Sequence, residues 1–167
     1  MRRIVLCLAA IAAMLARPEC APASSPAIDS SARTALRASG VPVLLPSPLP
    51  RAIGTIRSVA VVNAGRGGYY VGYSPLAHCA GALACAFFHV AGFAAPARLE
   101  PLAHDRPVLL FDGTHAVFRA KDCSGSSCTE ASLLFERRGS LYEIDAKVPA
   151  GDLTVLVSAY RTLHVVR

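Results

Sequence analysis

The sequence contains no tryptophan, few charged residues and only one long apolar run. Charged side chains make up 17% of the 167 residues, whereas they make up about 25% of an average soluble domain. The apolar run covers residues 4–16, which is shorter than the roughly 20 residues that a helix needs to cross a membrane. The basic residues beyond this run are scattered, with Arg137 and Arg138 as the one adjacent pair. The sequence therefore predicts neither a membrane-spanning helix nor the clustered basic stripe typical of nucleic-acid binding.

The first 23 residues follow the order of a cleavable signal peptide. Two arginines at positions 2 and 3 precede the apolar run, and residues 17–20 form a short polar stretch before Ala21-Pro22-Ala23. A basic start, an apolar centre and a small-residue A-x-A site are the signature of secretory signals. We therefore expect cleavage after Ala23, or next after Ala27, and a periplasmic or secreted protein. The net charge would fall from +6 to +4, because three arginines and one glutamate leave with the signal.

Cleavage would also reduce the six cysteines to four, which form two close pairs in the sequence. An even number of cysteines in an exported chain predicts disulfides. Four cysteines allow three connectivities. The residues within each pair are mostly small, so each loop can turn back and bring its two Cα atoms within disulfide range. This spacing favours the local bridges Cys79–Cys85 and Cys123–Cys128.

A zinc site is the alternative for the first cysteine pair. His78 and His89 flank it as H-C-x5-C-x3-H, which contains four potential zinc ligands. Structural zinc sites usually have the tighter C-x2-4-C spacing, and an oxidising compartment would consume the thiols. We therefore expect a disulfide loop and neither a metal nor another cofactor.

Residues 24–55 are expected to contain a short stub, one helix and an extended segment. Asp29 and the two serines after it offer N-cap side chains for a helix that Gly40 ends. Residues 41–50 include four prolines, which forbid a helix and disfavour an inner strand because proline has no backbone N–H. We interpret this segment as a linker whose valines and leucines pack along the sheet or the first helix. The alternative is a docking segment for a partner.

Residues 56–167 are expected to form an antiparallel sheet that ends with a helix. Turn sequences at residues 65–68 (GRGG), 112–113 (DG) and 137–140 (RRGS) separate valine-rich and aromatic stretches, as in β-hairpins. Apolar residues at helical spacing line one face of residues 153–160. We therefore predict one α+β domain: six or seven antiparallel strands, flanked by a short N-terminal helix and a C-terminal amphipathic helix. The expected strands are residues 58–64, 69–73, 84–94, 108–111, 114–120, 133–136 and 141–148.

A Ser-His-Asp site could be drawn from His115, Asp112 and the serines at positions 124, 126 and 127. Catalytic triads are recognised by geometry that sequence spacing does not supply, and the sequence contains no nucleophile elbow. We therefore interpret His115 as a surface residue of a hairpin. His104 and His164 have no identifiable partner in the sequence.

Three acidic residues, Glu136, Glu143 and Asp145, could face one another across a hairpin, as the paired carboxylates of glycoside hydrolases do. They alternate with apolar residues such as Tyr142 and Ile144, which is typical of a strand with one buried and one solvated face. We therefore interpret the acids as a solvated face with cross-strand partners among nearby basic residues. With the four cysteines oxidised, no thiol is left as a nucleophile. The sequence predicts no catalytic residue and favours a protein that is not an enzyme.

Several motifs occur in the order seen in a known group of proteins. An aromatic strand leads into a C-x-G-A-x-x-C loop at Cys79–Cys85, and a G-x-x-x-x-F strand leads into the short loop Cys123–Cys128. Next comes a hairpin with Phe135, at a position where tryptophan is more usual. An amphipathic helix at residues 153–163 ends the series. This order resembles a group of small exported bacterial α+β proteins. The resemblance covers about residues 69–163, implies both local disulfides and adds no activity.

The leading hypothesis is an exported, non-catalytic domain that binds a secreted protein or an envelope component. Loops on a rigid scaffold are common binding surfaces, and the two cross-linked loops would serve in this way. A narrower version is an inhibitor of a hydrolase. One alternative is a carrier of lipid or another apolar ligand, with a cavity between the sheet and the terminal helix. A second alternative is a hydrolase that uses His115 or the face with Glu143 and Asp145.

Overall fold

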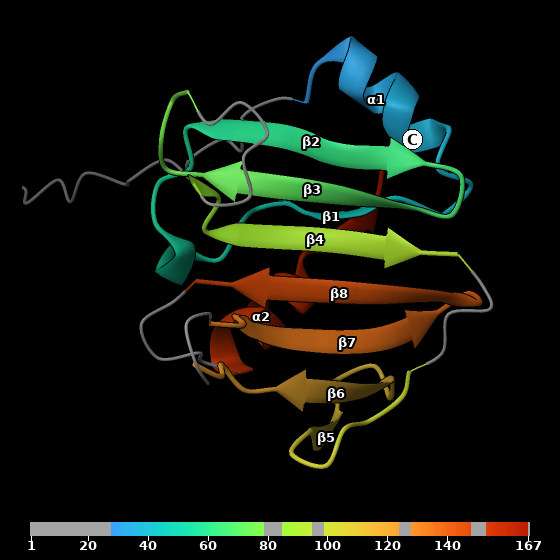
Figure 1. Ribbon diagram of the computed structural model, residues 1–167, viewed down its shortest axis with the longest axis vertical. Helices are drawn as coiled ribbons and strands as arrows, with labels where there is room; N and C mark the ends of the chain where they lie inside the picture. Colours follow the sequence, from blue (N-terminus) through green and yellow to red (C-terminus); the bar gives the residue numbers. More distant parts are fainter. Residues whose placement is uncertain (1–27, 79–84, 95–98, 124–127, 148–152, 167) are drawn as a thin grey trace, which may run out of the picture.

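The computed structural model describes residues 28–78, 85–94, 99–123, 128–147 and 153–166 of the chain (Figure 1). The predicted signal peptide and the stub that follows it lie outside these residues. In chain order the elements are α1 (Ser30–Arg37), β1 (Leu44–Pro46), a 3-10 turn (Arg51–Ile53), β2 (Ser58–Gly65), β3 (Gly68–Ser74), β4 (Phe88–Phe93), β5 (Arg106–Leu109), β6 (His115–Arg119), β7 (Ala131–Arg137), β8 (Ser140–Ala146), α2 (Leu153–Arg161) and β9 (Leu163–Val165).

Seven of the strands form one antiparallel sheet in the order β2-β3-β4-β8-β7-β6-β5. The remaining two, β1 and β9, pair with each other as a second, antiparallel sheet. The prediction of an α+β domain with a short N-terminal helix and a C-terminal helix is confirmed. The order of the strands has one non-sequential step, because β4 is followed in space by β8.

The three predicted hairpins are confirmed. β2 and β3 join through the glycine-rich turn, and β5 and β6 join through Asp112-Gly113. β7 and β8 join at Arg138-Gly139, where both residues have positive φ, 53° and 75°. Turns of this kind need the left-handed conformation, which glycine adopts without steric cost. The third predicted strand begins later than expected, at Phe88.

The helix α1 begins where its capping sequence indicated. The carboxylate of Asp29 accepts the backbone N–H of Ala32 at 2.7 Å, which satisfies one of the free N–H groups of the first turn. Leu36 is the buried residue of this helix, and α1 contacts β2 through that side.

The proline-rich segment is extended and packs against the sheet, as the linker interpretation expected. Its two valines and the leucines at positions 44 and 45 are buried, and two tyrosines of the sheet fix its backbone. The hydroxyl of Tyr69 accepts the N–H of Leu44 at 2.9 Å and donates to its carbonyl at 3.1 Å. The hydroxyl of Tyr142 donates to the carbonyl of Pro42 at 3.0 Å. The pairing of β1 with β9 was not expected, because two strands of three residues carry no periodic pattern.

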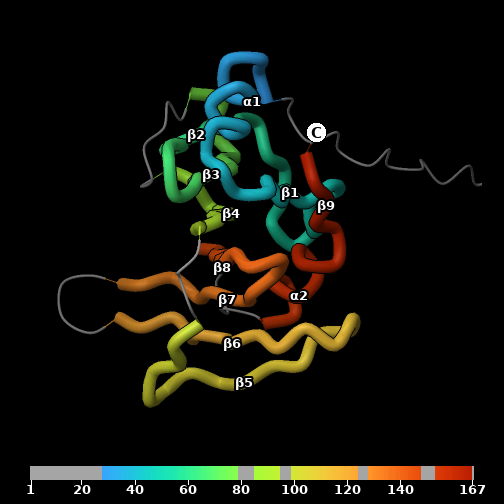
Figure 2. The backbone as a smooth tube through the Cα atoms, turned by 90° about the vertical axis from the view of Figure 1, so that its right-hand side faces the viewer, coloured from blue at the N-terminus to red at the C-terminus, as the bar shows by residue number. Residues whose placement is uncertain are grey.

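The core lies on one face of the large sheet. Figure 2 shows α2, β1 and β9 together on that side. Phe135 of β7 meets the ring of Tyr160 edge-on, with ring centroids 4.8 Å apart, and Leu156 and Ala159 of α2 are fully buried. The opposite face, which we call the open face, carries no helix in the described part of the chain (Figure 2).

The second predicted disulfide is present. Cys123 and Cys128 are bonded to each other, and beside them Asp122 and Thr129 form a bridge of two backbone hydrogen bonds, 3.2 and 2.7 Å long. The connection between β6 and β7 is therefore closed at its far end. In the first predicted bridge, Cys79–Cys85, Cys79 lies outside the described residues.

Candidate functional site

The open face contains a hollow of about 450 Å³ that is lined mainly by polar side chains. We call it the polar hollow. Its residues come from β3, β4, β6, β7 and β8 and from the segments that adjoin them, at the centre of the seven-stranded sheet. They are Tyr70, His89, Arg119, Cys128, Thr129, Glu130, Ser132, Glu143, Asp145 and Lys147.

The strand register explains why these side chains meet. In β8, Tyr142, Ile144 and Ala146 point to the core, so Glu143 and Asp145 point to the open face. Asp145 is opposite His89 of β4 on one side and Ser132 of β7 on the other, and Ser132 is in turn opposite Arg119 of β6. A polar row thus crosses four strands.

Glu143, in contrast, has apolar neighbours on both adjacent strands. Its cross-strand neighbours are Ala91 on β4 and Leu134 on β7, and Ala91 is opposite Tyr70 on β3. Ala91 and Leu134 are 1% and 9% exposed. The carboxylate of Glu143 therefore stands between two buried apolar side chains and has no basic residue opposite it.

Asp145 is held by two hydrogen bonds. Its Oδ1 lies 2.5 Å from Nδ1 of His89, and its Oδ2 accepts the hydroxyl of Tyr70 at 3.1 Å. The rings of Tyr70 and His89 lie against each other, with centroids 5.0 Å apart. Because an ionised carboxylate only accepts hydrogen bonds, Nδ1 of His89 carries the proton, and Nε2 of a neutral ring then presents a lone pair.

Burial and negative charge raise the pKa of the Tyr70 hydroxyl far above its ordinary value. Removal from water is the larger cause, and the charge and hydrogen bond of Asp145 add to it. The phenolate form would place a second negative charge beside Asp145, so Tyr70 stays a hydroxyl that donates. The hydroxyl of Tyr70 therefore helps to hold the carboxylate of Asp145 in position.

The pKa of Glu143 is also raised. The main cause is burial, which disfavours the ionised form, and the neighbouring charge of Asp145 acts in the same direction. The nearby hydroxyl of Ser132 and the charges of Arg119 and His89 oppose the rise without cancelling it. Among the described residues no lysine or arginine forms an ion pair with Glu143. The sequence led us to expect basic cross-strand partners for the acids of this face, and for Glu143 that expectation was wrong, because its neighbours across the strands are Ala91 and Leu134.

Two buried polar atoms beside these acids have no hydrogen-bond partner of regular geometry in the described structure. They are Nε2 of His89 and Oγ of Ser132, in side chains of residues that are 4% and 1% exposed. Leaving a buried polar group unpaired costs about 1–3 kcal/mol. The absence of a side chain at Gly72 makes room for the imidazole, since a Cβ there would lie 3.3 Å from Cδ2 of His89.

Two basic side chains at or near the hollow are engaged with other acids. Arg119 donates two hydrogen bonds to the carboxylate of Asp105, 3.1 and 2.9 Å long, and Lys121 lies 3.4 Å from Glu130. The guanidinium lowers the pKa of Asp105 chiefly through these hydrogen bonds. The charge of Arg119 is therefore balanced by Asp105 and not by Glu143.

The other candidates from the sequence do not gather into a site. His115 is exposed, and its expected partner Asp112 instead accepts the hydroxyl of Tyr160 at 2.7 Å. The three serines of that candidate triad lie outside the described residues. Glu136 is exposed and accepts the N–H of Leu99. The remaining histidines, His78, His104 and His164, are exposed.

His89 was a potential ligand only in the zinc alternative to the first disulfide, and in the structure its Nδ1 lies against the carboxylate of Asp145. No cluster of three or more His, Cys, Asp or Glu in the part of the chain that the structure describes could hold a metal ion. Ser132, His89 and Asp145 do lie in one row, but the aspartate is the middle residue. A serine nucleophile needs the histidine between itself and the aspartate, so this row is not a catalytic triad.

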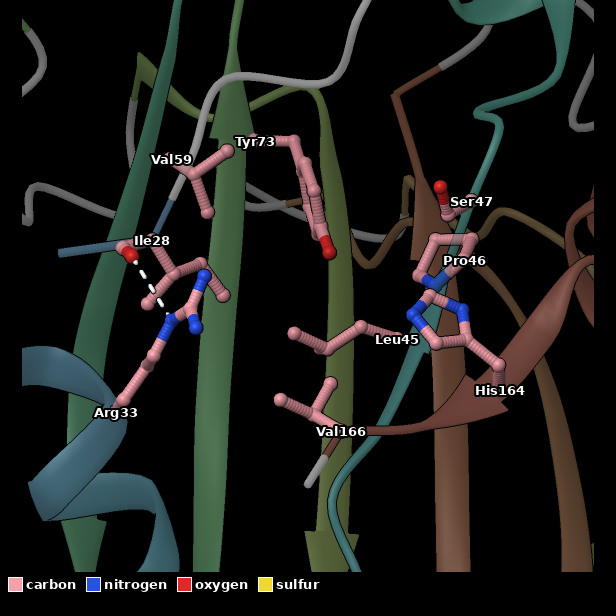
Figure 3. Close-up of a pocket in the computed structure, with 9 residues that line it drawn as sticks. All are labelled: Ile28, Arg33, Leu45, Pro46, Ser47, Val59, Tyr73, His164 and Val166. Carbon is pink, nitrogen blue, oxygen red and sulfur yellow. Dashed lines mark hydrogen bonds between the residues drawn. The ribbon is translucent and has the colours of Figure 1, made fainter. Parts of the chain in front are cut away.

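A second hollow, of about 210 Å³, lies between α1 and the β1–β9 pair. Figure 3 shows Arg33 reaching into it from α1, where it donates to the carbonyl of Ile28, and His164 beside Pro46. Most of its remaining lining is apolar. Neither of the two unpartnered polar atoms belongs to this hollow, so the polar hollow is the stronger candidate.

Comparisons with protein-family models, with curated proteins and with solved structures found no match for the chain. The fold and the hollow therefore carry the functional argument by themselves. Among the described residues, no helix is long and apolar enough to span a membrane.

Proposed function

We propose that the chain is an exported, non-catalytic domain that binds a protein partner on its open face, at the polar hollow. The carrying observation is the pair of buried, unpartnered atoms, Nε2 of His89 and Oγ of Ser132, in side chains that line the hollow. A bound partner that supplies hydrogen bonds to them would recover the free energy that their burial costs. Binding sites commonly place a few such polar groups on a preformed concave surface.

The scaffold around the hollow suits this function. Cys128, at one end of the hollow, belongs to the closed connection between β6 and β7, so that end is covalently tied. A disulfide of this kind is consistent with an oxidising compartment. Export itself is supported by the signal-peptide pattern of the first 23 residues, and the resemblance to small exported bacterial domains agrees with it.

The carrier alternative receives no support from the described core. A lipid cavity was expected between the sheet and the terminal helix. Instead, Leu156 and Ala159 of α2 are fully buried, and Tyr160 packs on Phe135. The side chains of the helix itself fill that space.

A hydrolase is the second candidate, because Glu143 and Asp145 share one hollow and burial raises the pKa of Glu143, as it does for catalytic acids. However, both oxygens of Asp145 already accept hydrogen bonds, from His89 and Tyr70. Each bond takes up a lone pair of Asp145, which disfavours this carboxylate as a nucleophile. Turnover of a chromogenic glycoside that is lost in Glu143→Gln would favour this candidate over binding.

Site-specific photo-crosslinking tests the proposed function. We would replace Tyr70, inside the hollow, with p-benzoylphenylalanine and illuminate cells that make the protein. Leu109 is the matched control position, because it is 68% exposed and lies on β5, away from the hollow.

The expected result is one discrete protein adduct at position 70 that excess unmodified chain suppresses, and no such adduct at position 109. The partner identified by mass spectrometry must then bind the unmodified protein saturably. No adduct at position 70, or equal adducts at both positions, would overturn the proposal.

A further inference from the structure

We infer that the polar hollow receives a cationic side chain of the partner, a lysine ammonium or an arginine guanidinium, with Glu143 as its main contact. This inference rests on the proposed function and names the chemistry of the group that is bound. It follows from a comparison of the carboxylates in the hollow that already have a hydrogen-bond or ion-pair partner with the one that has no ion pair.

Glu143 is the free acid of the hollow. The oxygens of Asp145 are used by His89 and Tyr70, and Glu130 faces Lys121. Glu143 has apolar residues on both sides and no ion pair among the described residues. Its carboxylate is therefore the acceptor that a donor from outside can reach and neutralise.

The buried hydroxyl of Ser132 is the second observation. On β7, Ser132 is opposite Asp145, and Leu134 is opposite Glu143. Ser132 therefore lies diagonally across from Glu143 on the open face. The residue is 1% exposed. Its Oγ makes no hydrogen bond of regular geometry, although it lies close enough to Glu143 to oppose the rise in the pKa of that carboxyl. An ammonium group with three donors, or a guanidinium with five, can satisfy the carboxylate and the hydroxyl together.

The charges that face Glu143 favour a cation over an anion. Asp145 on the same strand adds a second negative charge, while His89 on β4 and Tyr70 on β3 are bonded to that charge. Arg119 on β6 is balanced by Asp105. Lys147 is the other cation of the hollow, and it lies four residues from Glu143, beyond Asp145 on β8. An anionic group near Glu143 would meet two like charges, which is a costly arrangement.

The test is a nuclear magnetic resonance titration of the isotope-labelled chain. The probes are butylammonium and butylguanidinium, and butyrate and sodium chloride at equal concentration are the controls. The variant is Glu143→Gln, which keeps the shape of the side chain and removes its charge. Glu100→Gln is the matched control, because Glu100 is an exposed acid outside the hollow.

We expect saturable shifts of the amide signals of Ala91, Ser132 and Glu143 with both cations and not with butyrate. Loss of a charge-assisted hydrogen bond should weaken this binding about tenfold to a hundredfold in Glu143→Gln, and Glu100→Gln should bind as the native chain does. Equal shifts with butyrate, or undiminished binding by Glu143→Gln, would overturn the inference.

The crosslinking experiment separates this inference from the function on which it rests. An adduct at position 70 that is lost in the Glu143→Gln background supports both. An adduct that persists there in full supports the docking surface and overturns the cation as its main contact. No adduct at position 70 in the native background overturns the proposed function.

Discussion

The hydrogen bond between Tyr70 and Asp145 allows a sharp prediction, because Tyr70→Phe removes one oxygen and keeps the ring. The ring would still lie against His89, so the change isolates the bond of 3.1 Å to Oδ2. A hydrogen bond to a charged group contributes about 1.5–3 kcal/mol. Tyr70 is only half-buried, and water can replace part of the lost bond. We therefore expect the lower end of that range, a loss of about 1.5 kcal/mol in the free energy of unfolding.

Urea unfolding at neutral pH measures this loss, as a lower midpoint with an unchanged slope. Tyr73→Phe makes the same chemical change on the core face of the same strand and should have a smaller effect. A double-mutant cycle with Asp145→Asn isolates the pair, and the two single effects should sum to more than the double mutant loses. If Tyr70→Phe is no more destabilising than Tyr73→Phe, or if the cycle is additive, the assigned role of this bond is wrong.

Three further outcomes are expected. Burial raises the pKa of Glu143 above its ordinary value of 4.5, so the native chain loses stability as the pH rises through the shifted pKa and Glu143 ionises in the folded state. The variant Glu143→Gln has no such loss. Its free energy of unfolding relative to the native chain, measured with urea, should therefore increase between about pH 4 and about pH 7, and a constant difference would contradict the assignment. Replacing Cys123 and Cys128 together by serine should cost at most about 2 kcal/mol of unfolding free energy, and a larger loss would mean that the bridge supports the core. Leu156→Ala should cost about 2–5 kcal/mol by calorimetry, and a neutral result would imply a loose interior under α2.

The features that could be predicted from the sequence are local ones. A hairpin is specified by two or three turn residues, and Gly139 with its positive φ is an example. The start of α1 is specified by one carboxylate, Asp29. In each case the signal and the structure that it produces lie within a few residues of each other, so no knowledge of distant partners is needed.

The environment of the candidate site could not be predicted, because it depends on pairing between distant strands. The sequence placed Glu143 and Asp145 on the same face, since alternation is local, and it singled out His89 for a different reason. It did not show that β4 is the neighbour of β8, which brings His89 to Asp145 and Ala91 to Glu143. Without that register, basic cross-strand partners are the reasonable expectation for an alternating acidic strand.

The step from β4 to β8 divides the large sheet into two groups of strands that follow chain order. β2, β3 and β4 form one group, and β5, β6, β7 and β8 form the other. Within each group, strands that adjoin in the sheet also follow each other along the chain. The seam between the groups is the pairing of β4 (Phe88–Phe93) with β8 (Ser140–Ala146). Contacts between distant segments require larger loops to close and form more slowly.

The polar hollow lies across this seam, with His89 on one side and Asp145 on the other. In a folding chain the two halves can therefore each form their hairpins before the polar hollow exists. The contact between His89 and Asp145 forms only when the two halves join, so a chain that has formed its hairpins but not this contact lacks the polar hollow.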